Sequence, residues 1–336
     1  MIKVSRRTLM TGAAGAALGA AAALPAFGAE RNVFRIYMVT LRGWTDTDDG
    51  FRDYFETRRI PVQLIHRDVN RDMSKLAGII AEIKQAKPHL VYVWGTGISI
   101  GVIGKHNAID PAKHITDIPT VFTNVSSPIG SGLVKDLEPT GRNVTGSTFL
   151  VPMTAQISAM TSYRPVNRLG VIFNPDEQNS VETVDELRER TQVMGIKLFE
   201  RPIPIVDGEP DKTTLRGLVE SLVPEKIDFL YIPPDSFLSK HARDFTHAAL
   251  EHRLPTFAAA EGTLKDSYAL MGLISRYYNI GKLAGYQAER ILVNRIAPGA
   301  MPIEGLTRYS LIINKEVAKE LDLVPPMLML RFAELS

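Results

Sequence analysis

The stretch LGVIFNPD at residues 169–176 decides the fold of this chain. Its five apolar residues run without interruption, which is typical of a strand in a parallel sheet that helices cover on both faces. A small polar turn follows, and residues 177–194 then have the pattern of a long helix. In open parallel α/β sheets, ligands bind at the carboxyl ends of the strands. We therefore look for function in the turns that follow strands, such as Asn174-Pro175-Asp176.

The same strand–turn–helix unit recurs along the chain from Val33 onward. Apolar, β-branched segments predict strands at residues 33–40, 61–66, 89–94, 119–123, 144–147, 169–173, 196–201, 229–232, 255–258, 269–273 and 309–313. Amphipathic segments predict helices at residues 48–58, 74–86, 98–107, 154–163, 177–194, 212–223, 240–252 and 280–294, with another from Lys315. Two successive runs of alternating strands and helices predict two α/β domains built on parallel sheets.

Length and composition narrow the class of protein. At 336 residues the chain is long enough for about two domains. Its 39 Lys and Arg residues nearly balance 37 Asp and Glu residues, which argues against a dedicated nucleic-acid binder. Cysteine is absent, which excludes disulfides, thiolate metal sites and a cysteine nucleophile. We expect no metal, because the seven His residues are scattered and form no HExxH motif. We expect no dinucleotide cofactor, because the glycines at 95, 97 and 101 follow the third strand with the spacing GxGxxxG, not the GxGxxG of a dinucleotide-binding first turn.

The first 29 residues have the three parts of a secretory signal. A basic start at residues 3–7 precedes an apolar stretch rich in Ala and Gly at 9–27, and small residues follow at 28–29. Residues 5–10, SRRTLM, resemble the twin-arginine export motif. The alternative is an uncleaved anchor, but Pro25 interrupts a stretch that is only about as long as the shortest membrane spans. We expect cleavage near residue 28 or 29 and a soluble protein in the periplasm.

Gly97-Ile98-Ser99-Ile100-Gly101 matches the GxSxG motif and lies between a strand and a helix, as a nucleophile elbow does. A hydrolase would use Ser99 as its nucleophile and a later His as its base. However, His241, His247 and His252 all fall within or at the end of one predicted helix, and the chain has no HGGG-type oxyanion loop. We expect Ser99 to cap a helix or to donate a hydrogen bond to a ligand. An exported serine esterase that uses Ser99 is the alternative.

Three other features could carry function. Trp44 lies in a loop after the first strand and Tyr277-Tyr278 precedes the long helix, where aromatic rings could stack on a ligand or pack within the loop. Residues 46–50, DTDDG, resemble a calcium loop, but the Gly comes one position early, so we expect a helix start. Glu261 could bind an ammonium group or begin a helix.

Several motifs, taken in order, resemble one protein family. They are DIPTVFT at 117–123, GSGLV at 130–134, NVTG at 143–146, VP at 151–152, GVIFNP at 170–175 with NS at 179–180, YIPPD at 231–235, YY at 277–278 with Gly281, Ala284 and Ala288, and IIN at 312–314 with Ala318 and Leu321. Together they resemble the solute-binding proteins of ABC transporters, in the family that includes tryptophan- and phenylalanine-binding members. The resemblance covers about residues 33–330 and is weakest in the first segment.

The resemblance implies a type I periplasmic binding protein, with two Rossmann-like lobes, three crossing segments and a ligand cleft between the lobes. We expect the N-terminal lobe at residues 30–148 and 276–306 and the C-terminal lobe at 149–275 and 307–336. On this interpretation the protein is a monomer and not an enzyme. Its lobes close over a small ligand by a hinge motion, and the closed form docks on an ABC permease. A periplasmic sensor subunit, with a receptor in place of the permease, is the alternative role.

The positions that match the family, together with Arg42 and Trp44 in the loop after the first strand, give the candidate ligand-binding residues. They are Arg42, Trp44, Thr96, Ser99, Thr123, Ser126, Ser127, Asn174, Asn179, Ser180, Asp235, Ser236, Glu261 and Tyr277. Hydroxyl groups and open backbone N–H groups would bind a carboxylate, and Asp235 or Glu261 would bind an ammonium group. The expected ligand is therefore an amino acid, with aromatic ones among the candidates, or a related carboxylate.

Two turns depart from the family's pattern. Ser127-Pro128 stands where members often have Asp-Pro, and Pro234-Asp235-Ser236 stands where they often have Thr-Asp-Asn. Two residues of the first loop could compensate for these changes. Arg42 would favour a carboxylate through bidentate hydrogen bonds, and Trp44 would favour a flat ligand.

Overall fold

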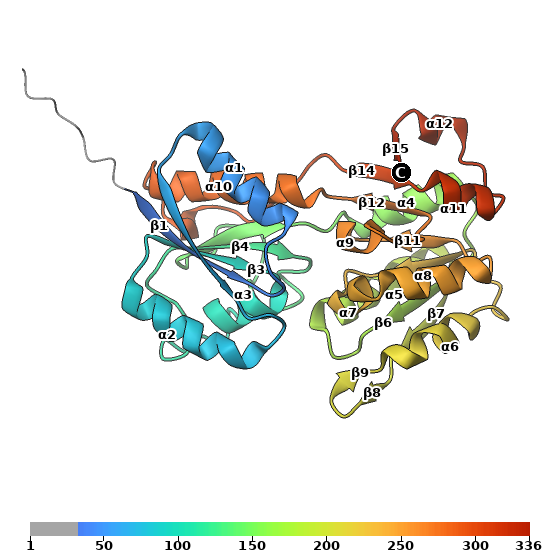
Figure 1. The fold of residues 1–336 in the computed structure, drawn as a ribbon, viewed down its shortest axis with the longest axis horizontal. Coiled ribbons are helices and arrows are strands. Elements are labelled where there is room, and N and C mark those ends of the chain that lie inside the picture. Colours follow the sequence, from blue (N-terminus) through green and yellow to red (C-terminus); the bar gives the residue numbers. More distant parts are fainter. Residues whose placement is uncertain (1–32) are drawn as a thin grey trace, which may run out of the picture. The chain divides into compact units, whose positions relative to one another are not determined.

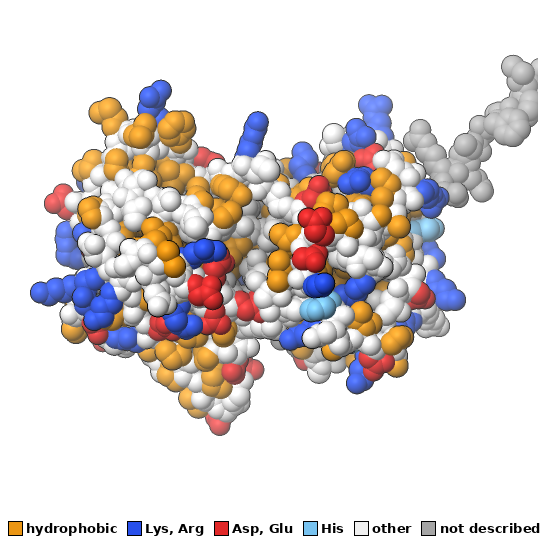
Figure 2. All heavy atoms as spheres, turned by 180° about the vertical axis from the view of Figure 1, so that it is seen from behind, with side chains coloured by type: hydrophobic (Ala, Val, Ile, Leu, Met, Phe, Trp, Pro, Cys, Tyr) orange, Lys and Arg blue, Asp and Glu red, His pale blue; other side chains and the backbone are white. Residues whose placement is uncertain are grey.

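A computed structural model describes residues 33–336 of the chain, so the predicted export signal lies outside the described residues. The described part contains two large sheets with helices on their faces (Figure 1). Among residues 33–336, no helix combines the length and the hydrophobicity needed to cross a bilayer. On the face shown in Figure 2, hydrophobic side chains lie in small separate groups among charged and polar ones.

The first sheet has six strands, and every neighbouring pair is parallel. Their order is β13 (Glu304–Gly305), β5 (Val144–Thr148), β4 (Thr120–Val125), β3 (Leu90–Trp94), β1 (Phe34–Thr40) and β2 (Val62–Asp68). Its helices are α1 (Asp46–Arg58), α2 (Leu76–Ala86), α3 (Thr96–Ile103) and α10 (Tyr277–Leu292). One buried cluster joins α1 and α10 to one face of the sheet, and a second cluster joins α2 and α3 to the other face. Strands buried on both faces explain the uninterrupted apolar run LVYVW of β3.

Helices α1 and α10 approach each other closely because two glycines lie at their contact. A Cβ atom at Gly281 would lie 1.8 Å from the carbonyl oxygen of Thr47, and one at Gly50 would lie 1.9 Å from the carbonyl oxygen of Tyr278. The chain therefore returns more than 200 residues after α1 to complete the first sheet's helical layer.

The second sheet has seven strands. Their order is β15 (Ala333–Leu335), β14 (Ser310–Ile313), β12 (Met271–Ile274), β11 (Thr256–Ala258), β10 (Phe229–Ile232), β6 (Arg168–Phe173) and β7 (Lys197–Pro202). Its larger helices are α4 (Met153–Tyr163), α5 (Gln178–Met194), α6 (Leu215–Glu220), α8 (Ala242–Glu251) and α11 (Lys315–Glu320). Strand β14 runs antiparallel to β12, whereas the other neighbouring pairs are parallel. The sheet is thus mostly parallel, as predicted, with two reversed strands, β14 and β15, at one edge.

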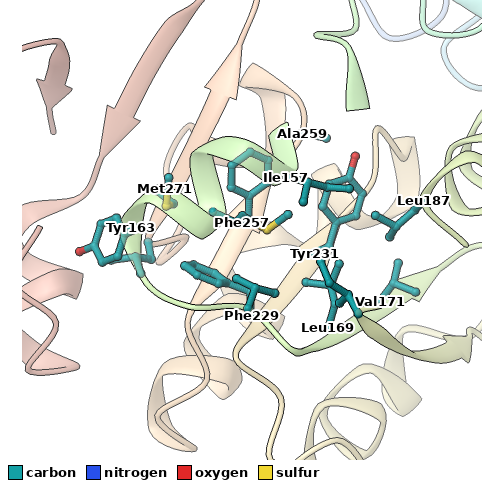
Figure 3. Close-up of a cluster of buried hydrophobic side chains, with 14 of the residues drawn as sticks. Ile157, Tyr163, Leu169, Val171, Leu187, Phe229, Tyr231, Phe257, Ala259 and Met271 are labelled. Atoms are coloured by element: carbon teal, nitrogen blue, oxygen red, sulfur yellow. The ribbon is translucent and has the colours of Figure 1, made fainter. Parts of the chain in front are cut away.

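The core of the second sheet is rich in aromatic residues. Tyr231 and Phe257 stack on neighbouring strands with ring centroids 5.9 Å apart, and Tyr163 of α4 meets Phe229 edge-on at 6.2 Å (Figure 3). All four side chains are buried. Such rings bury large apolar areas and hold strand ends in fixed positions, which matters because the turns after these strands face a pocket.

Most predicted elements are present, with shifted ends. The predicted helix 240–252 is present as α8, and a short helix that was not predicted, α7 (Ser236–Lys240), precedes it and meets it at His241. The long helix α10 begins at Tyr277, three residues before its predicted start. The sequence analysis did not predict the hairpin β8 (Ile205–Val206) and β9 (Glu209–Pro210), the short helices α9 (Glu261–Leu264) and α12 (Met327–Leu330), or the edge strands β13 and β15. These segments are too short to show a periodic pattern.

Candidate functional site

A pocket of about 450 Å³ lies between turns from both sheets. The turns that line it follow β1, β2, β3, β4 and β5 of the first sheet and β6, β10 and β11 of the second. The structure brings eight of the fourteen candidate residues into its lining. They are Arg42, Thr96, Ser126, Asn174, Asn179, Asp235, Ser236 and Tyr277.

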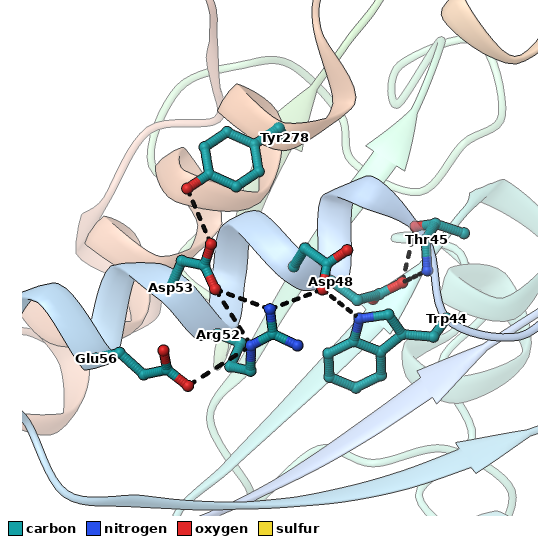
Figure 4. A network of polar contacts seen from close by, with 8 residues as sticks. Trp44, Thr45, Asp48, Arg52, Asp53, Glu56 and Tyr278 are labelled. Atoms are coloured by element: carbon teal, nitrogen blue, oxygen red, sulfur yellow. Dashed lines mark hydrogen bonds and ion pairs between the residues drawn. The ribbon is translucent and has the colours of Figure 1, made fainter. Parts of the chain in front are cut away.

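Trp44 is placed outside the pocket lining, on the surface beside α1. Its indole N–H donates to Asp49 Oδ1 at 2.9 Å, and the guanidinium of Arg52 lies 5.8 Å from its ring centroid (Figure 4). Its ring also meets His66 edge-on at 5.4 Å. Asp49 and Arg52 belong to α1 and His66 to β2, so these contacts hold the tryptophan on the surface beside α1. Residues 46–50, which resemble a calcium loop, form that helix start, with a capping box between Thr45 and Asp48.

Ser99, Thr123 and Ser180 are fully buried and do not line the pocket. The hydroxyl of Ser99 donates to the carbonyl of Gly95 at 2.7 Å, so it supports the first turn of α3. It contacts no His in residues 33–336, and this leaves the GxSxG motif without the base that a serine nucleophile needs. Thr123 donates to Asn124 Oδ1 at 3.3 Å, and Ser180 donates to Asp235 Oδ2 at 2.7 Å. These hydroxyls hold pocket residues in place.

Ser127 and Glu261 also lie outside the lining. Ser127 Oγ accepts the backbone N–H of Gly130 and closes a turn. Glu261 accepts from the guanidinium of Arg276 at 2.8 Å and from the backbone N–H of Tyr277 at 2.6 Å. The carboxylate of Glu261 therefore fixes the start of α10 and is already paired with a cation.

The second-sheet wall of the pocket carries two adjacent carboxylates. Asp235 is 3 % exposed and caps α7 through the N–H of Leu238 at 2.8 Å, while its other oxygen accepts from Asn174 N at 2.9 Å and from Ser180. Glu177 accepts the N–H of Ser236 at 2.8 Å and the side-chain amide of Asn179 at 3.0 Å. Burial, followed by the negative charge of Asp235, raises the pKa of Glu177 to about 7. A cation that entered this part of the pocket would relieve that repulsion.

The first-sheet wall carries hydrogen-bond donors and positive charge. Helix α3 begins at the pocket with Thr96 and Gly97, and no side chain caps its first turn. The open N–H groups and the helix dipole of such an end attract anions. The guanidinium of Arg42 lies 4.9 Å from the ring centroid of Trp94. Arg71 also lines this wall, and burial together with the charge of Arg42 lowers its pKa.

Aromatic rings line the same pocket. Phe149 meets Tyr277 edge-on with ring centroids 5.8 Å apart, and Trp94, the last residue of β3, also lines the pocket. Rings from three separate segments give the pocket an apolar part beside its charged walls.

The candidate residues leave out eight lining residues that contribute charge or rings, and the amide of Asn124. The eight are Arg71, Trp94, Phe149, Asp176, Glu177, Glu209, Phe237 and Lys240. The sequence analysis places Trp94 at the end of a strand and Glu177 at the start of a helix and gives neither a role in binding. A signal existed for both, since each directly borders a turn after a strand, where ligands bind in such sheets.

The geometry is that of a ligand pocket between two α/β units, and comparison with known proteins gives its class. The family model for ABC transporter substrate-binding proteins matches residues 52–334. The chain belongs to this family. The sequence-based assignment to solute-binding proteins of ABC transporters is therefore confirmed, as is the mostly parallel α/β fold of the type I periplasmic binding proteins.

One curated relative and two solved structures are similar to most of this chain. A tyrosine-binding protein of Clostridioides difficile is 27 % identical over 277 residues, which cover 82 % of this chain and 74 % of the relative. A conserved domain protein of Vibrio cholerae has a similar crystal structure, with a TM-score of 0.77, 23 % identity and coverage of 90 % of this chain and 99 % of the other. A Streptococcus pneumoniae ABC domain in complex with L-Trp gives a TM-score of 0.74, 21 % identity and coverage of 89 % and 99 %.

Proposed function

We propose that this family member is the solute-binding component of an ABC importer and that it captures an L-amino acid, aromatic ones first among the candidates, or a related small carboxylate. The observation that carries the proposal is the opposition of charge across one pocket. Arg42, Arg71 and the open start of α3 lie on the first-sheet wall, whereas Glu177 and Asp235 lie on the second-sheet wall, whose lining also includes Lys240. A zwitterion has one group for each wall. The tyrosine-binding relative supports the same ligand class.

The proposed mechanism is capture without chemistry. The N-terminal lobe, residues 30–148 and 276–306, would close on the C-terminal lobe, residues 149–275 and 307–336, by a hinge motion. Closure buries the charges of the ligand, and each buried charge needs a partner because an unpaired one is very costly. The carboxylate would pair with the first-sheet wall and the ammonium with Glu177, while Trp94, Phe149 and Tyr277 contact the side chain.

The proposed setting follows from the family. The mature chain, cleaved after the twin-arginine-type signal, would diffuse in the periplasm as a monomer and deliver its ligand to a permease of the inner membrane. Micromolar affinity corresponds to about −8 kcal/mol, which is under −1 kcal/mol per heavy atom for an amino acid of about a dozen atoms. This is within reach of a pocket that supplies two charge pairs and an aromatic contact.

A thermal-shift panel tests the proposal. L-tyrosine, L-tryptophan and L-phenylalanine are compared with tyramine, which lacks the carboxylate, and with 3-(4-hydroxyphenyl)propionate, which lacks the ammonium. At least one amino acid should raise the melting temperature in a concentration-dependent way, by more than either one-charge analogue. Folded protein that shifts with none of the amino acids contradicts the ligand class.

A further inference from the structure

Two buried donors of the pocket have no acceptor among residues 33–336. They are the indole N–H of Trp94 and the side-chain NH₂ of Asn124. Trp94 is the last residue of β3, and Asn124 is the next to last residue of β4. Trp94 is 6 % exposed and Asn124 is 5 % exposed, and both line the pocket. A buried donor without an acceptor destabilises the folded state, so such groups are uncommon in folded proteins. Two of them on adjacent strands indicate that an acceptor comes from outside residues 33–336.

The backbone at Asn124 is also unusual. Its φ is +53°, in the left-handed region that most side chains avoid and that Asn tolerates. The pairing of β4 with β5 shifts its register between Phe122 and Val125, at the same place. The side-chain oxygen of Asn124 is already occupied, because Thr47 Oγ1 donates to it at 3.1 Å. The amide is therefore held by its oxygen, and its NH₂ group is left for another acceptor.

The surroundings of these donors favour an anionic acceptor. Arg42 lies over the Trp94 ring, and Thr96 and Gly97 present the uncapped N-terminus of α3 beside it. The acidic residues of the lining, Asp176, Glu177, Glu209 and Asp235, all come from the second-sheet part of the chain. The first-sheet part of the lining therefore carries donors and cations and no carboxylate, whereas the second-sheet part carries four carboxylates and one cation, Lys240.

We infer that Trp94 and Asn124, together with Arg42, form the subsite that binds the carboxylate of the ligand and so fix its orientation in the pocket. This inference rests on the proposed function, because it assigns one end of the proposed zwitterion. Trp94 Nε1 and Asn124 Nδ2 each donate to the carboxylate, while the guanidinium and the start of α3 neutralise its charge. The ammonium group then points toward Glu177 on the opposite wall.

The chain offers a matched pair of variants for the test. Trp94→Phe removes the indole N–H of the pocket and keeps an aromatic ring, and Trp44→Phe does the same at the other tryptophan, which is bonded to Asp49 outside the pocket. Asn124→Asp keeps the shape and the tolerance of left-handed backbone but replaces the NH₂ donor with a carboxylate oxygen. Asn294→Asp, at an exposed position outside the lining, controls for the added charge.

Calorimetry with L-tyrosine and L-tyrosinamide separates the carboxylate from the rest of the ligand. For L-tyrosine we expect Trp94→Phe to weaken binding about tenfold or more and Asn124→Asp to weaken it roughly 100-fold, whereas the control variants change it less than about threefold. L-tyrosinamide has no carboxylate, so its already weak binding should differ little among the variants. Equal losses for both ligands would overturn the inference, because the two side chains would then serve the shape of the pocket alone.

A spectroscopic readout keeps the result independent of folding defects. In a ¹H–¹⁵N spectrum the two indole N–H signals are assigned with Trp44→Phe. L-tyrosine should move the Trp94 signal downfield, as a new hydrogen bond does, and leave the Trp44 signal in place. An unmoved Trp94 signal despite calorimetric binding overturns this subsite and leaves the importer function standing. Absence of binding by all three aromatic amino acids to the unchanged protein overturns the ligand class and the subsite together.

Discussion

The two walls of the pocket differ in where their polar groups find hydrogen-bond partners. On the second-sheet wall, Asp235 and Glu177 accept hydrogen bonds from the chain itself, so this wall is complete before a ligand arrives. On the first-sheet wall, Trp94 and Asn124 keep donors without acceptors among the described residues. Polar residues on one side of a pocket can thus stabilise the fold, while those on the other side bind the ligand. Changes to Asp235 and Glu177 should therefore affect folding and binding, whereas loss of the unpaired donors on the first-sheet wall should weaken binding without removing a hydrogen bond within residues 33–336.

The largest effect is expected at Asp235. Asp235→Ala should lower the free energy of unfolding by about 3 kcal/mol, because it removes the cap of α7 and leaves the buried N–H of Asn174 and the hydroxyl of Ser180 without their acceptor. Asp211→Ala is the control, since Asp211 caps a short surface helix through Thr213 and should cost about 1 kcal/mol or less. Urea unfolding measures both. Equal losses would show that the second-sheet wall is no more integral to the fold than an exposed cap.

The next effect depends on pH and on Glu177. Its pKa of about 7 in the folded protein is above the ordinary 4.5, so between these values the folded state binds more protons than the unfolded state. The free energy of unfolding should therefore fall as pH rises from about 5 to 8, by at most about 3 kcal/mol from this group. Asp235 is the carboxylate that faces Glu177, and Arg71 of the first-sheet wall opposes it with positive charge.

Glu177→Gln cannot ionise and should flatten this pH dependence. Unfolding by urea at pH 5, 6, 7 and 8 gives the comparison. If the free energy of unfolding of the variant changes as steeply with pH as that of the unchanged protein, the titrating group is not Glu177.

A smaller effect, confined to binding, is expected at Arg42. Arg42→Lys keeps the charge but loses the planar fork that a carboxylate accepts and weakens the contact with the Trp94 ring, so affinity for L-tyrosine should fall about tenfold. Unfolding free energy should change by less than about 0.5 kcal/mol. Arg52→Lys is the matched control, because Arg52 lies over Trp44 outside the pocket. A clear fall in the free energy of unfolding of Arg42→Lys would show that the first-sheet wall also stabilises the fold.

The smallest effect is expected at an ion pair outside the pocket lining. Lys265, at the end of α9, lies 3.0 Å from Asp46 Oδ2, at the start of α1, and both side chains are about half exposed. Such surface pairs contribute about 0–1 kcal/mol, so Lys265→Ala should leave unfolding and L-tyrosine affinity nearly unchanged. An affinity change above about fivefold would mean that recognition extends beyond the two walls.

Much of the fold could be predicted from the sequence, whereas the site could be predicted only in part. The helical period of α5 and the uninterrupted apolar run of β6 can be recognised in the sequence, and the family motifs give the order of such elements along the chain. Thr96 and Asn174 could be predicted because they follow strands, and ligands bind at the carboxyl ends of the strands in such sheets. Trp94 and Ser180 show the limit, because both border such turns, yet the tryptophan lines the pocket and the serine lies behind Asp235. Only tertiary packing decides which side of a turn meets a ligand.

The close contact of α1 with α10 has a consequence for the order of synthesis. Strand β1 and helix α1 leave the ribosome first, but the layer that covers Phe51 and Phe55 is completed by Ala284 and Ala288 of α10, and β13 joins the sheet later still. The part of the protein that begins first is therefore among the last to be finished. Until about residue 305 has been made, the apolar face of this early segment lacks the helix α10 and the strand β13 that complete it.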